Sequence, residues 1–101
     1  MEKKLLQIIN HYGIRNQQRK LNEEVFELNE AIINRECYED YLPYEYADQD
    51  YRNYLKGHIT EEIADIEVML LQFKEYYQID GNDILRIMNE KIDRQLRRME
   101  E

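Results

Sequence analysis

The chain has 101 residues, of which 43% are hydrophobic and 36% charged, and its formal net charge is −8 at pH 7. This is the length of one domain with a single modest core, and the composition is that of a globular chain. The negative charge argues against binding a nucleic-acid polymer, and no apolar run approaches the roughly 20 residues of a membrane span. The lone Cys37 excludes an internal disulfide and favours a cytoplasmic location.

Four helices are predicted in chain order, separated by the few glycines of the sequence. They span residues 2–11, 14–35, 58–77 and 83–99, and the turn QIDGN precedes the last. Apolar residues at helical spacing form one stripe along each of the three longer helices. The stripe of the second helix comprises Ile14, Leu21, Val25, Leu28 and Ile32. The stripe of the third comprises Ile59, Ile63, Ile66, Leu70, Phe73 and Tyr77, and that of the fourth comprises Leu85, Met88, Ile92, Leu96 and Met99.

With no strand pattern and short connections, these helices predict an all-α fold, a four-helix bundle-type domain over residues 1–101. The third helix is also apolar on its opposite face, through Ala64, Val68 and Leu71. A helix that is apolar on two faces is usually buried on both, and a domain this small cannot cover both alone. We therefore expect a homo-oligomer, a dimer or a tetramer. A central helix within a monomer is the alternative.

Residues 35–57 form the predicted connection between the second and third helices, and they hold six of the nine tyrosines. A short helix over 47–55 is expected within it. The segment is either an acidic surface loop that covers one end of the bundle or a lid whose tyrosines pack on a base. Tyrosine suits both, because its ring is apolar and its tip is polar.

Two acidic pairs lie at the edges of the apolar stripes. Glu24 and Glu27 are three residues apart on the second helix, and Glu62 and Asp65 are three apart on the third. Residues at this spacing share a helix face, so on facing helices the four carboxylates would converge. Their mutual repulsion would need a cation, and an oxygen-only ligand set suits Mg²⁺, or Mn²⁺ as a substitute, better than zinc.

Each pair also has a purely structural interpretation. Thr60 is a plausible N-cap, so Glu61 and Glu62 would then only complement a helix dipole. Glu24 and Glu27 could pair with Lys20 or with arginines of other helices, whereas Glu23 and Glu30 fall on the solvated face. Asp65 is the hardest to explain this way, because aspartate is a poor former of helix interiors.

A basic flank on the fourth helix complements these acids. Lys91, Arg94 and Arg98 share one side of the helix. They form either a solvated face, favoured near a helix C-terminus, or a phosphate-binding site in which Lys acts as a point charge and Arg as a fork. Metal-binding acids facing such a flank are what a polyphosphate ester needs.

At these residues the sequence resembles the MazG-like all-α nucleoside triphosphate pyrophosphohydrolase superfamily. The resemblance rests on EEVFE (23–27) and EIAD (62–65), which match an EExxE segment followed by an ExxD segment. The wider pattern of YG at 12–13, QRKLNEEVFEL at 18–28 and KIDRQLRR at 91–98 is also similar. It covers most of the chain, although the tyrosine-rich connection is long for a compact member.

The resemblance implies a helical dimer or tetramer that hydrolyses a (d)NTP to the nucleoside monophosphate and pyrophosphate. It makes the two acidic pairs the Mg²⁺ ligands, namely Glu24, Glu27, Glu62 and Asp65. Catalytic roles would fall to Glu23, Glu24 and Glu62, and substrate phosphates would meet Lys91, Arg94 and Arg98. Tyr12 and Gln18 would line the base pocket. The partner is then a nucleoside triphosphate, with neither nucleic acid nor membrane, and the alternatives are a non-catalytic helical interaction module or a nucleotide-binding sensor.

Overall fold

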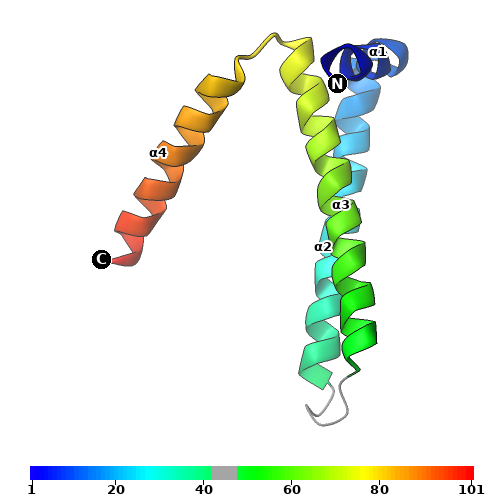
Figure 1. The fold of residues 1–101 in the computed structure, drawn as a ribbon, viewed down its shortest axis with the longest axis vertical. Helices are drawn as coiled ribbons and strands as arrows, with labels where there is room; N and C mark the ends of the chain where they lie inside the picture. Colours follow the sequence, from blue (N-terminus) through cyan, green and yellow to red (C-terminus); the bar gives the residue numbers. More distant parts are fainter. Residues whose placement is uncertain (42–47) are drawn as a thin grey trace.

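The computed structural model describes residues 1–41 and 48–101, and these residues are all-helical with no strand. In chain order the helices are α1 (Glu2–Tyr12), α2 (Ile14–Tyr41), α3 (Gln49–Tyr76) and α4 (Gly81–Met99). Figure 1 shows α2 and α3 side by side and antiparallel, with α1 lying across them where α2 begins and α3 ends. The predicted all-α fold class is confirmed.

The tyrosine-rich segment is mostly helical rather than a loop. α2 continues to Tyr41 and α3 already begins at Gln49, so the predicted connection over 35–57 is wrong for most of its length. The short helix expected over 47–55 is the start of α3 itself. Asp48 caps this helix, since its side chain accepts a hydrogen bond of 2.9 Å from the Asp50 amide. Residues 42–47, which the predicted lid would include, lie outside the described residues.

Two tight turns set the direction of the chain. Gly13 alone joins α1 to α2, with φ of 92°, a left-handed conformation that favours glycine. After α3, Gln78 takes φ of 55°, and the Ile79 amide donates to the Lys74 carbonyl at 2.9 Å. Asp80 then caps α4 by accepting from the Asn82 amide at 2.9 Å, as the predicted turn QIDGN requires.

The contact between α2 and α3 follows a polar line rather than the predicted apolar stripes. Every seventh residue of α2 is buried at Gln17, Glu24 and Ala31. The same spacing on α3 buries Leu55, Glu62 and Met69, and Gln72 is buried beside them. A seven-residue repeat is what keeps one seam of two supercoiled helices in contact. The predicted stripes therefore lie beside the seam, not in it.

Those stripes instead form a partly exposed face on one side of the α2–α3 pair. Val25 is 41% exposed, Ile63 43% and Leu70 51%. The apolar residues that are buried, other than those of the seam, are Leu5 and Ile9 of α1. The stripes are therefore only partly covered within a single chain: Leu21, Leu28 and Ile66 are half-buried beside the seam, whereas the stripe residues above stay open.

α4 stands apart from the other three helices, as Figure 1 shows, and none of its residues is buried. Its stripe of Leu85, Met88, Ile92, Leu96 and Met99 is more than half exposed at every position. The radius of gyration is accordingly 17.7 Å, against about 13 Å for a compact domain of this length. Within the described residues, α1, α2 and α3 pack against one another and α4 extends away from them, so the all-helical arrangement is consistent with a bundle whose fourth helix is open. In the described ranges no helix has both the length and the apolar character that crossing a membrane requires.

Candidate functional site

Three carboxylates meet at the middle of the α2–α3 seam. One oxygen from each of Glu24, Glu62 and Asp65 lies within 4.8 Å of the other two. Glu24 and Glu62 are 7% and 8% exposed, whereas Asp65 opens to solvent. The Oε2 atoms of Glu24 and Glu62 are buried, and neither has a hydrogen-bond partner within the part of the chain that the structure describes. Unpartnered buried oxygens of this kind are unusual, and a water molecule, an ion or a ligand would satisfy them.

Two basic side chains flank the cluster, one on each helix. The Lys20 ammonium lies 3.4 Å from Glu24 Oε1 and 3.9 Å from Glu23 Oε2. His58 Nε2 lies 3.5 Å from Glu62 Oε1. Each basic group precedes its carboxylate by one helical turn and is partly exposed. In both pairs the contact is with the Oε1 atom of the carboxylate.

The charges of the cluster show in the pKa values of two residues. Burial, together with the repulsion from Glu27 and Asp65, raises the pKa of Glu24 above its usual range, although Lys20 opposes part of this effect. The hydrogen bond and the opposite charge of Glu24 raise the pKa of Lys20. Glu24 therefore carries its negative charge at a cost that a nearby cation would offset.

The helix-dipole interpretation of Glu61 and Glu62 is wrong. Thr60 is not an N-cap, because α3 begins at Gln49 and Thr60 lies well inside it. The Thr60 hydroxyl instead donates to the Lys56 carbonyl at 2.9 Å, one turn back along the helix. Glu62 therefore has no free helix terminus to complement.

Among the predicted acidic residues, Glu27 and Glu23 lie outside the buried cluster. Both are exposed, and they border the same shallow cavity on the outer side of α2. Glu27 still acts on the cluster, because its charge contributes to the raised pKa of Glu24. The structure thus brings together three of the four predicted metal ligands and leaves Glu27 one turn away.

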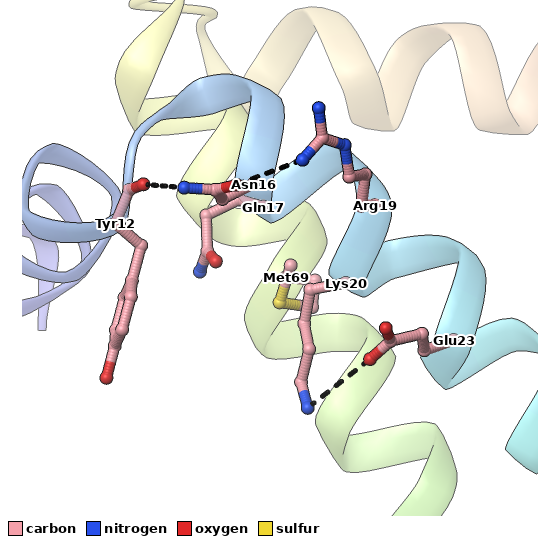
Figure 2. A pocket seen from close by; sticks show the side chains of 7 residues that line it. All are labelled: Tyr12, Asn16, Gln17, Arg19, Lys20, Glu23 and Met69. Carbon is pink, nitrogen blue, oxygen red and sulfur yellow. Dashed lines mark hydrogen bonds and ion pairs between the residues drawn. The ribbon is translucent and has the colours of Figure 1, made fainter.

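A cavity of about 450 Å³ opens next to the cluster at the α1 end of the seam. Figure 2 shows its lining, with Lys20 and Glu23 paired on one side and Tyr12 hanging from the end of α1 on the other. Met69 of α3 forms the floor. Gln18, the other residue predicted for the base pocket, lines a different cavity together with Leu21 and Phe73 on the apolar side. Tyr12 and Gln18 therefore do not form one pocket, because residues six apart on α1 and α2 fall on opposite sides of the seam.

The predicted phosphate-binding residues are not at the cluster. Lys91, Arg94 and Arg98 lie on α4, which leads away from the seam (Figure 1). Lys91 and Arg94 line a shallow surface cavity of their own on that helix. Within one chain they are not placed to meet a ligand held by the three carboxylates.

Several residues at the site were not expected from the sequence. No role was expected for His58, whereas its imidazole lies beside Glu62, four residues after it. Gln17 and Gln72 are buried in the seam, where Gln17 Nε2 donates to Gln72 Oε1 at 2.8 Å. The seven-residue spacing from Gln17 to Glu24 and from Leu55 to Glu62 could have predicted these buried positions. The apolar stripes were the more obvious pattern, so this spacing was overlooked.

Comparisons of the chain with protein-family models, with curated proteins and with solved structures gave no match in any of the three.

Proposed function

We propose that this protein is a Mg²⁺-dependent nucleotide pyrophosphohydrolase of the MazG-like kind, cleaving a nucleoside triphosphate to the monophosphate and pyrophosphate. The observation that carries the proposal is the convergence of Glu24, Glu62 and Asp65 around two buried, unpartnered carboxylate oxygens. Such oxygens cost about 1–3 kcal/mol each when they stay unpaired. A chain that merely displayed surface charge would gain nothing from this placement.

The donor set fits a hard divalent cation. It consists of carboxylate oxygens alone, which suit Mg²⁺ or Mn²⁺, and the open side at Asp65 leaves room for a ligand. Glu24, Glu62 and Asp65 would hold the ion, and Glu27 is near enough in sequence to join through a water. A bound Mg²⁺ would supply charge stabilisation to the phosphoryl group under attack.

The remaining steps fall to side chains of the rim. Glu23 is exposed and borders the cavity at the α1 end of the seam, where an attacking water would enter. A carboxylate in that position can orient the water and accept its proton. Lys20, between Glu23 and Glu24, adds a positive charge toward which a phosphate chain would extend.

We also propose that the active form is a homo-oligomer, a dimer or a tetramer. The accessible surface of the chain is 8512 Å², whereas a compact monomer of 12.5 kDa exposes about 6,200 Å². The excess is of the order that obligate dimers bury. Exposed apolar side chains lie on the α2–α3 stripes and along α4, so a second copy could cover the stripes. The same copy could bring the α4 cations Lys91, Arg94 and Arg98 toward a cluster that they do not reach within their own chain.

The direct test is pyrophosphate release from a panel of canonical and modified NTPs and dNTPs with Mg²⁺, Mn²⁺ or EDTA. Glu62→Gln should abolish turnover while the far-ultraviolet circular dichroism stays that of the native helices. Glu61→Gln is the matched control, because Glu61 is the exposed neighbour on the same turn, and it should keep activity.

Turnover retained by Glu62→Gln would contradict the assignment of the cluster. Release that is absent across the panel although Mg²⁺ and nucleotide both bind would indicate a sensor rather than an enzyme. Absence of both binding and release would leave a helical interaction module.

A further inference from the structure

A second cavity opens on the other side of the acidic cluster, toward the far end of the seam. Its volume is about 470 Å³, within the range of small-molecule sites. Tyrosine rings from both helices line it, Tyr38 from α2 and Tyr51 and Tyr54 from α3, and Asn34 adds a polar group. Aromatic rings with a few polar groups are the usual lining of a site for a planar ligand.

Two of the three tyrosine rings form a stacked pair. The rings of Tyr51 and Tyr54 are nearly parallel, with an interplanar angle of 19° and centroids 6.0 Å apart. A planar ligand between two rings would need about 7 Å, twice the contact distance of carbon atoms. A ligand would therefore stack on an outer face of the pair. Tyr38 packs against Tyr51 with centroids 4.8 Å apart, and its hydroxyl accepts from the Asp48 amide at 2.8 Å, which fixes its ring.

One residue of the cavity lining also contacts the acidic cluster. His58 lines it, and its Nε2 lies 3.5 Å from Glu62 Oε1. Tyr54 precedes Glu62 by two helical turns on α3, about 12 Å along the axis. The sugar and phosphate chain of a nucleotide can bridge that distance.

The two cavities differ in the charge of their lining, and this difference predicts which way round a nucleotide would bind along the seam. The cavity at the α1 end contains the cations Arg19 and Lys20, and the far cavity contains the tyrosine rings, with the carboxylates between them. A phosphate chain fits the end with the cations, and a base fits the end with the rings.

We propose that the cavity of Tyr38, Tyr51 and Tyr54 is the subsite for the nucleobase, in place of Tyr12 and Gln18. The inference rests on the proposed function, because it assumes that the acidic cluster holds the phosphates of a nucleotide through a divalent cation. The base stacks on the outer face of the tyrosine pair, and Asn34 and His58 are the hydrogen-bonding groups nearest to its edge.

The test compares two ligands that share the phosphate chain and differ in the base. One is an α,β-methylene nucleoside triphosphate, which resists hydrolysis at the bond in question, and the other is inorganic tripolyphosphate. Both are titrated with Mg²⁺ by calorimetry. Four variants are compared with the unmodified chain: Tyr54→Ala, Tyr54→Phe, Tyr12→Ala and Tyr77→Ala. The matched control is Tyr77, because it is 61% exposed against 67% for Tyr54 and 56% for Tyr12, and it faces the apolar side.

Base stacking contributes about 1–3 kcal/mol, so Tyr54→Ala should weaken binding of the nucleotide about 5- to 150-fold. Binding of tripolyphosphate should stay unchanged, Tyr54→Phe should keep the affinity, and Tyr77→Ala should alter neither ligand. The exposed Cys37 lines the same cavity and gives a second readout. The nucleotide should slow its alkylation, whereas tripolyphosphate should not.

The two proposals fail in different ways. The tyrosine subsite would be overturned if the unmodified chain bound nucleotide and tripolyphosphate with equal affinity. It would also be overturned if only Tyr12→Ala lost affinity for the nucleotide. In both cases the proposed phosphate site would remain. Binding of neither ligand in the presence of Mg²⁺ would overturn the proposed function and the base subsite with it.

Discussion

Glu24→Gln separates a metal site from a cluster of surface acids, because it removes the buried charge and keeps the shape of the side chain. Without a divalent cation the substitution should stabilise the protein. With Mg²⁺ it should have the opposite effect, because it removes one of the ligands. The sign of the change therefore depends on the cation.

The magnitude follows from the spacing of the carboxylates. Two unit charges 4.8 Å apart repel by about 3.5 kcal/mol at an effective dielectric constant of 20. Glu24 faces two such neighbours, but the Lys20 ammonium at 3.4 Å and the solvent around Asp65 offset most of the repulsion. A net gain of about 1–2 kcal/mol remains for the variant. For a domain of this size, that raises the melting temperature by at least about 4 °C.

The assay is thermal unfolding followed by circular dichroism, at one protein concentration, in EDTA and across a Mg²⁺ series. The unmodified chain should gain about 2.7 kcal/mol at a Mg²⁺ concentration of 100 times the dissociation constant. The variant should start higher and gain little, so the two curves should cross. Glu30→Gln, an exposed carboxylate of the same helix, is the control and should follow the unmodified chain. A variant that is less stable in EDTA and keeps the full Mg²⁺ response would refute the reasoning.

Three further outcomes are expected. Burial raises the pKa of Glu24 above its ordinary 4.5, so the folded state binds this proton more tightly than the unfolded state does. Without metal, the free energy of unfolding should therefore fall as the pH rises through 4.5. It should level off above the pKa that Glu24 has in the folded state. Saturating Mg²⁺ should remove that fall, as unfolding titrations at several pH values will show. Gln72→Leu should cost about 1–3 kcal/mol by leaving Gln17 unpaired in the seam, and Gln17→Leu in the same chain should restore part of the loss in denaturant unfolding. Leu70→Glu, on the exposed apolar stripe, should shift the mass measured by light scattering toward the monomer, whereas Glu67→Gln on the exposed side of α3 should not.

The helices were predictable because their signals are local. Helical periodicity and the glycines predicted the four helices in the right order, although α4 begins at Gly81, two residues earlier than expected. The ends of α2 and α3 were not predictable in the same way. Both helices extend into a segment that its composition marks as a loop, and the Tyr38–Tyr51 contact between their ends is long-range.

The site was predictable in its residue types and less so in its position. The spacing of three residues within each pair identified Glu24, Glu62 and Asp65 correctly as neighbours. It also placed them at the edge of an apolar core, whereas the structure places Glu24 and Glu62 in the helix contact itself. The sequence shows which helix faces are apolar, but it does not show which of them a single chain buries. The apolar stripes of α2 and α3 were therefore expected between these two helices, whereas they lie beside the contact.

The composition of the seam links the site to assembly. Helices usually associate through apolar residues, yet α2 and α3 meet through Gln17, Gln72, Glu24 and Glu62, with Ala31, Leu55 and Met69 as the apolar members. A seam this polar contributes little hydrophobic stabilisation, and two of its carboxylate oxygens are unpaired. Under the proposed function, the missing stability comes from a cation bound at the seam and from a second copy that covers the apolar stripes beside it. Metal binding and oligomer formation would then stabilise the same α2–α3 pair, so each should favour the other. Mg²⁺ should therefore strengthen the association of the chains, and dilution of the protein should weaken its affinity for Mg²⁺.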